Sequence, residues 1–123
     1  MNFRTLGLAS IAVALSTIPA SAHHSFAMFD GNKSVTLEGT VKDFLWTNPH
    51  AWVVIVVQDE QGQPQTWSFE CPSPSGLARK GWLPKTLTPG MKVSVVTHPL
   101  KNGSTGGSLV TLTLPDGKVL ASE

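Results

Sequence analysis

The sequence predicts an all-β domain with one short helix. Three observations support this prediction: apolar and polar residues alternate over 35–42, a continuous apolar run covers 51–57, and a helix signal follows the third expected strand. Two or three further strands come after the helix. Five strands with a helix between the third and fourth is the layout of an OB-fold, so we expect a small OB-like β-barrel of five to six strands. A small open sandwich of the same strands is the alternative.

The first three strands are predicted from local patterns. Alternation over 35–42 indicates a half-buried strand, and Gly39 interrupts its apolar face, where we expect a bulge or sharp bend. The β-branched run at 51–57 predicts a strand that is covered on both faces. Residues 66–70 place Trp67 and Phe69 on one face of the third strand.

The helix is predicted from its end signals. Ser73 is the expected N-cap, Pro74 the first helical residue and Gly81 the C-cap. Beyond it we expect strands at 92–97 and 109–114 and a short one around Val119 and Leu120. The Gly- and Ser-rich stretch 101–108 is expected to be a flexible loop.

Residues 1–22 are typical of a secretory signal peptide. Arg4 provides a positive start, Leu6–Leu15 is apolar, and Ala20-Ser21-Ala22 matches a small-residue cleavage site. A membrane anchor is the alternative, but the apolar stretch is short for a span of about 20 residues. We therefore expect a periplasmic or secreted protein without a membrane span in its mature form. Residues 23–123 would form a single barrel domain with an N-terminal arm at 23–34.

Composition excludes several function classes. The chain of 123 residues is long enough for one domain and too short for a separate cofactor domain. Removal of residues 1–22 takes away Arg4 and no acidic residue, which leaves equal numbers of acidic and basic residues, so no nucleic acid is expected as a partner. The single cysteine, Cys71, rules out an internal disulfide framework and a multi-cysteine zinc site.

Cleavage after Ala22 would make His23 the first residue. Its α-amine and imidazole can then chelate a metal through two nitrogens, and a third histidine nitrogen would give an N-rich set that suits Cu(II). His50 in Asn-Pro-His is the expected partner, with His24 and His98 as auxiliaries. The prediction is a small exported binding protein whose possible cofactor is copper.

A different function class stays open. The four histidines can equally be structural: a terminal His pair is often solvated, and His50 and His98 can close turns or strand ends. The chain would then be a protein- or envelope-interaction module that binds no metal, with an unidentified envelope protein as partner. Most of the four tryptophans are expected to pack in the barrel. Trp46, Asn48 and Trp82 are nevertheless the candidates for ligand contact.

Enzymatic signals are weak, and we expect no enzyme. No G-x-S-x-G elbow occurs, and the carboxylates are scattered over different elements. A catalytic interpretation would need a pocket that unites Glu70, Cys71 and a histidine. We expect Cys71 instead to be a core or half-buried thiol.

Several stretches together resemble a family of small exported bacterial proteins of unknown function. The resemblance implies export after the signal and a single compact β-domain; the family has no established activity or ligand. It covers the whole mature chain, and it rests on His23-His24-Ser25-Phe26, Phe29-Asp30, Leu37-Glu38-Gly39-Thr40-Val41, Trp46-Thr47-Asn48-Pro49-His50, Glu70, Ser73-Pro74, Leu77, Gly81-Trp82, Leu87, Pro89-Gly90, Val93, Val95, Leu109 and Asp116-Gly117.

Overall fold

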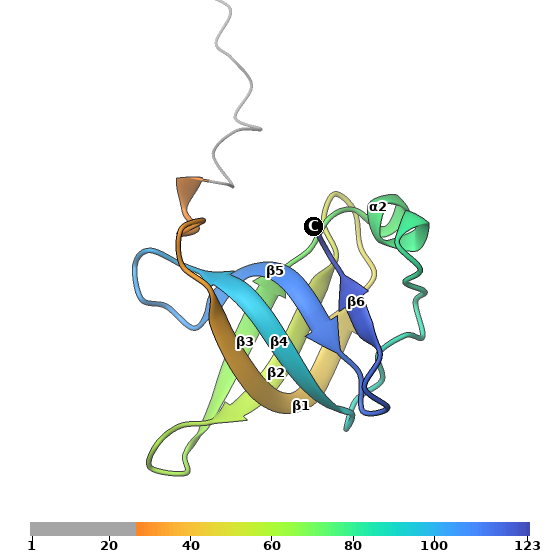
Figure 1. Ribbon diagram of the computed structural model, residues 1–123. Coiled ribbons are helices and arrows are strands. Elements are labelled where there is room, and N and C mark those ends of the chain that lie inside the picture. Colours follow the sequence, from red (N-terminus) through yellow and green to blue (C-terminus); the bar gives the residue numbers. More distant parts are fainter. Residues whose placement is uncertain (1–26) are drawn as a thin grey trace, which may run out of the picture.

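The computed structural model describes residues 27–123 (Figure 1). The predicted signal peptide, His23 and His24 lie outside these residues, so their predictions stay untested. The described part contains six strands and one short helix. In chain order these elements are β1 (Val35–Leu45), β2 (Trp52–Gln58), β3 (Pro64–Glu70), α2 (Pro74–Arg79), β4 (Lys92–Pro99), β5 (Gly106–Thr113) and β6 (Val119–Ala121).

Five of the strands close into a barrel. The sheet order is β3-β2-β1-β4-β5-β6, and an additional parallel pairing of β3 with β5 joins the two sides. All other neighbours are antiparallel, and β6 extends the sheet beyond β5. The barrel therefore has the expected OB-like architecture: an all-β domain with one short helix between the third and fourth strands. Figure 1 shows how β1 curls around the barrel to reach both β2 and β4.

The stretch 101–108 is only partly the loop that its composition predicts. β5 begins at Gly106, and Gly106–Ser108 pairs with Ser68–Glu70 to close the barrel. Glycine is required here because a Cβ on Gly106 would lie 2.9 Å from the Ser68 carbonyl oxygen of β3, and a Cβ on Gly107 would overlap Thr97 Oγ1 of β4. Glycines that permit close backbone approach inside a sheet have the same composition as a flexible loop, which explains the error.

The irregularity expected at Gly39 lies further along β1. The register of β1 against β2 shifts between Val41 and Asp43, so the bulge is there. Gly39 is instead needed for close strand contact, because a Cβ at this position would lie 2.6 Å from the Val56 carbonyl oxygen. The missing side chain lets β2 cross closely over the point where β1 changes partners.

The helix begins and ends close to its predicted signals. The Ser73 side chain accepts a hydrogen bond from the Gly76 amide at 3.2 Å, and Pro74 is the first helical residue. The C-cap is Lys80 rather than Gly81, and Gly81 follows it with a φ of 92°. A positive φ there allows the chain to leave the helix without a Cβ penalty.

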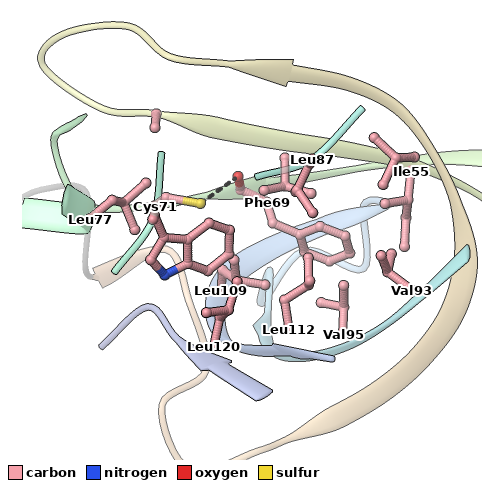
Figure 2. Packing of buried hydrophobic residues seen from close by; sticks show 14 of the residues in the cluster. Ile55, Phe69, Cys71, Leu77, Leu87, Val93, Val95, Leu109, Leu112 and Leu120 are labelled. Atoms are coloured by element: carbon pink, nitrogen blue, oxygen red, sulfur yellow. Dashed lines mark hydrogen bonds between the residues drawn. The ribbon is translucent and has the colours of Figure 1, made fainter. Parts of the chain in front are cut away.

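The core is built from the inward faces of the strands. Alternate residues of β2 and β3 point inward, among them Ile55 and Phe69, both with no exposed surface. Leu109 and Leu112 of β5 meet them from the other side of the barrel, as Figure 2 shows. Leu77 brings the helix into the same cluster. The fold thus places the barrel core next to α2, at the end where β3 and β4 finish.

The described part of the predicted arm docks on the barrel. Phe29 is buried and forms a bridge with Leu100, and the Asp30 amide donates to the Pro99 carbonyl at 2.9 Å. Residues 27–34 therefore run beside the end of β4 before the chain enters β1. Across 27–123, the structure contains no helix with the length and apolar character needed to cross a bilayer.

Candidate functional site

A cavity of about 720 Å³ lies at the end of the barrel where β3 and β4 finish and β5 begins. This volume is within the range of small-molecule sites, roughly 300–1,000 Å³. Its walls combine apolar side chains with two histidines, two glutamates and one lysine. The lining residues are Phe29, Gly31, Pro49, His50, Glu70, Cys71, Pro72, Ser73, Lys80, His98, Ser108, Leu109, Ser122 and Glu123.

His50 is held by the loop between β1 and β2. The Thr47 hydroxyl donates to the His50 carbonyl at 2.8 Å, across the cis Asn48–Pro49 bond. His50 Nδ1 lies 2.9 Å from the Cys71 carbonyl oxygen, and because a carbonyl only accepts, Nδ1 donates. His50 Nε2 lies 3.4 Å from Glu70 Oε1.

His98 repeats this arrangement on β4. Its Nδ1 donates to the Lys33 carbonyl at 2.8 Å, and its Nε2 lies 3.4 Å from Glu123 Oε1. In both histidines one ring nitrogen is thus bound to the backbone and the other is directed at a carboxylate. The backbone bonds also join distant parts of the chain, since His98 ties the arm to β4.

The strand register brings the two histidine–carboxylate pairs into one cavity. Glu70 of β3 is paired with Ser108 of β5, and Ser108 is paired with His98 of β4. Paired residues on neighbouring strands point to the same face of a sheet. Glu70, Ser108 and His98 therefore form a row across the barrel closure, with His50 beyond Glu70.

The 3.4 Å separation in each pair has a chemical consequence. A direct hydrogen bond between an imidazolium and a carboxylate is shorter, about 2.7–2.9 Å. Two adjacent ligands bound at 2.0–2.1 Å lie about 3.3–3.4 Å apart on a tetrahedral metal ion and about 2.8–3.0 Å apart on a tetragonal Cu(II). Hydrogen bonding of Nδ1 to a carbonyl is also how metal-binding histidines are commonly oriented. Each pair therefore offers two donors at tetrahedral ligand spacing, which would have to close by about 0.5 Å around Cu(II).

Neither pair is a complete metal site on its own. Within residues 27–123, no group of three histidine, cysteine or acidic side chains is close enough to hold one ion. A bound ion would therefore take its remaining ligands from water, from residues before Ala27 or from another molecule.

Cys71 lines the cavity but is not available as a nucleophile. It is 3% exposed, and its Sγ donates to the Phe69 carbonyl oxygen at 3.8 Å (Figure 2). Burial raises the pKa of the Cys71 thiol from 9.0 to about 12. The expectation of a buried core thiol is confirmed. Glu70, Cys71 and His50 do share one cavity, yet the thiol remains protonated and faces the core.

The three residues predicted to contact a ligand lie away from the cavity walls. Trp82 is fully buried, and its Nε1 donates to the Ala121 carbonyl at 2.8 Å, so it packs the core and has no surface for a ligand. Trp46 is half-buried and packs edge-on against Phe44. Asn48 is exposed in the loop before Pro49. A ligand role for Trp46 and Asn48 stays a prediction.

The structure brings together two of the four predicted histidines, His50 and His98. Sequence reasoning treated Glu70 as one of several scattered carboxylates and missed Glu123 entirely. Both carboxylates become visible only through long-range pairing, because Glu70 and His50 are 20 residues apart and Glu123 and His98 are 25 apart. No local motif marks either pair.

Comparison with protein-family models identifies a match. The model of a family of unknown function (DUF6152) matches residues 10–109. This range includes both histidines of the cavity and Glu70, and it ends before Glu123. No curated protein and no solved structure matches the chain.

Proposed function

The chain belongs to this family of unknown function; on that premise we propose that it is a small exported binding protein, not an enzyme, and that its ligand is a transition metal, copper first. One observation carries the proposal. His50 and His98 line the same cavity, and each has Nδ1 bound to a backbone carbonyl and Nε2 3.4 Å from a carboxylate oxygen. Such fixed imidazoles lose little side-chain freedom when they bind a ligand.

Copper is favoured by the kind of donors. Imidazole nitrogen and carboxylate oxygen both suit divalent first-row metals, and at a given site of this kind Cu(II) binds more tightly than Zn(II). The α-amine and imidazole of His23 would add two nitrogens after processing. The four residues from His23 to Ala27 span at most about 14 Å, and Phe29 lines the cavity. This short length supports a site that the His23 nitrogens could join.

A binding role agrees better than catalysis with the cavity's chemistry. The thiol of Cys71, the strongest nucleophile in the chain, is buried with its pKa raised to about 12, so it supplies no thiolate at neutral pH. The histidine–carboxylate pairs are instead disposed as ligand pairs.

The test begins with the processed protein. The full chain is expressed in a bacterium, recovered from the periplasm or medium, and its first residue is determined by mass spectrometry. We expect His23 at the N-terminus. Cu(II) and Zn(II) are then titrated separately by calorimetry into this protein and into a His23→Ala, His50→Ala double variant. We expect copper to bind more tightly than zinc, and the double variant to lose most of the copper affinity.

Two results would count against the proposal. Equal copper affinity in the wild type and the double variant would place the metal elsewhere. A protein that keeps residues 1–22 and stays in the cytoplasm would refute export. The His98→Ala variant is the companion measurement, since it reports whether the second pair contributes to the same ion or holds its own.

A second candidate function has its own supporting observation. The Nδ1 bonds of His50 and His98 tie separate segments together, as structural histidines would. Leu83 and Val119 are 64% and 60% exposed, and their segments are joined by the Trp82–Ala121 hydrogen bond. Exposed apolar side chains of this kind would suit contact with an envelope protein. If copper binding is absent, cross-linking in the periplasm with a photoreactive residue at 83 tests the interaction, with position 60 in the β2–β3 hairpin as the control.

A further inference from the structure

The cavity is much larger than a hydrated metal ion requires. Its volume is about 720 Å³. An ion with six waters fills roughly 200 Å³, since each water occupies about 30 Å³. The remaining space is bounded by apolar side chains from four separate segments, Phe29, Pro49, Pro72 and Leu109. Small-molecule sites have this character, with apolar walls and few polar groups.

The cavity's side chains supply too few ligands to complete the coordination of a metal ion. Each histidine–carboxylate pair supplies two ligands, and residues 27–123 contain no group of three. A transition metal bound by one pair has two ligands from the described residues, so its remaining positions go either to the two His23 nitrogens or to a chelator that takes their place. An organic chelator that fills these positions would at the same time occupy the apolar space.

Charge narrows the class of chelator. Apart from the two imidazoles, the walls carry the two carboxylates of Glu70 and Glu123 and the ammonium of Lys80, a formal balance of −1. A divalent ion with one monoanionic chelator carries +1. The Lys80 ammonium, which donates to the Ser122 carbonyl at 2.9 Å, lies in the same wall as a partner for the chelator's carboxylate.

We propose that the cavity binds the metal together with a small aromatic N,O-chelator of the pyridine-carboxylate kind, with His50 and Glu70 as the protein's ligands. This proposal rests on the metal-binding function proposed above. The flat ring would lie against the apolar walls, and Ser108, in register between Glu70 and His98, would face it from the floor. The protein would then capture a metal complex rather than a free ion.

The experiment compares two chelators with the same donor atoms. Cu(II) alone, Cu(II)–picolinate and Cu(II)–glycinate are titrated into the processed protein. Picolinate and glycinate both offer one nitrogen and one carboxylate oxygen, and only picolinate has a ring. We expect the picolinate complex to bind about tenfold more tightly than the glycinate complex, from burial of the ring.

A substitution in the cavity floor supplies the second measurement. Ser108→Leu should fill part of the cavity beside Glu70, and Ser94→Leu is the matched control, a half-buried strand serine outside the cavity wall. We expect Ser108→Leu to bind the picolinate and glycinate complexes with equal affinity, whatever its affinity for Cu(II) alone. Ser94→Leu should keep the preference for picolinate.

The outcomes separate this proposal from the one on which it rests. Copper binding with equal affinities for the two complexes refutes the chelator and leaves the metal-binding function standing. Absence of binding for all three titrants refutes both. Binding of picolinate without copper also overturns the proposal, because the ring would then be held with no metal between it and the protein. If Ser108→Leu does not fold, the comparison of picolinate with glycinate in the wild type still decides.

Discussion

The carboxylate of Glu70 lies 3.4 Å from the Nε2 atom of His50, while the Cys71 carbonyl accepts a hydrogen bond from Nδ1 of the same ring. The imidazole is thus fixed between the backbone of one residue and the side chain of its neighbour. Glu70 is mostly covered, with 13% of its side chain exposed, whereas Glu123 in the second pair is 52% exposed. Glu70 is thus the more shielded of the two carboxylates.

This difference predicts which carboxylate matters for metal binding. Glu70→Gln keeps the shape of the side chain and removes its charge, and we expect copper affinity to fall about 10–100-fold. Glu60→Gln, in the β2–β3 hairpin, is the control and should bind as the wild type does. Calorimetric titration measures both. Unchanged affinity in Glu70→Gln would remove Glu70 from the site.

A side chain at position 39 should create a packing defect in the barrel wall. A Cβ at this position would lie 2.6 Å from the Val56 carbonyl oxygen, and backbone cannot move aside cheaply. Gly39→Ala should lower the free energy of unfolding by about 1–3 kcal/mol. Gly31→Ala is the matched control, because nothing lies within 4 Å of a Cβ there. Urea denaturation measures the stability of both variants. Equal midpoints would show that the β2 backbone moves aside at no cost in free energy.

The Trp82 side chain joins the segment after α2 to the last strand through a hydrogen bond, and we expect this contact to stabilise the fold. Trp82→Phe removes the hydrogen bond to the Ala121 carbonyl and leaves a gap in the core. We expect a loss of about 2–3 kcal/mol in the free energy of unfolding. Trp52→Phe, at a half-buried position on β2, should cost less than about 1 kcal/mol. A Trp82 variant as stable as the wild type would contradict the structural role given to this residue.

Cys71 predicts a specific loss of stability at high pH. The folded protein holds the pKa of the thiol at about 12, whereas the unfolded chain ionises near its ordinary value of 9.0. Stability from this group is complete below pH 9 and is lost as pH rises through this window, by about 1.4 kcal/mol per pH unit. Cys71→Ala lacks this slope. Denaturation curves of both proteins between pH 8 and 11 measure it, and parallel pH profiles would refute the buried thiol.

The same thiol should resist modification in the native state. A disulfide reagent at pH 8 is expected to leave Cys71 unlabelled until denaturant is added, because the thiolate is absent and the residue is 3% exposed. Rapid labelling of the folded protein, measured by mass spectrometry, would contradict this.

The parts of the fold that local patterns encode could be predicted. The alternation in β1, the apolar run of β2 and the Ser73-Pro74 start of α2 each depend on neighbours in the chain. The bulge after Val41 and the start of β5 at Gly106 depend on which strands meet across the barrel, and composition alone indicated a loop for the second. Local pattern specifies an element, and tertiary contact sets its register.

The candidate site divides in the same way. The sequence alone indicated the histidines as candidate metal ligands and placed His98 at a strand end. Glu70 acquires its place only because β3 pairs with β2 and β5 in one particular register. A shift by one residue would turn Glu70 to the inside of the barrel and away from Ser108.

The closure between β3 and β5 rests on three residue pairs, whereas β2 and β3 share seven. The two histidine–carboxylate pairs stand on either side of this short contact. A molecule that spans the cavity would therefore connect the two sides of the shortest strand pairing in the barrel. Its binding should slow amide hydrogen exchange at Gly106–Ser108, so exchange at this closure would report whether the cavity is occupied.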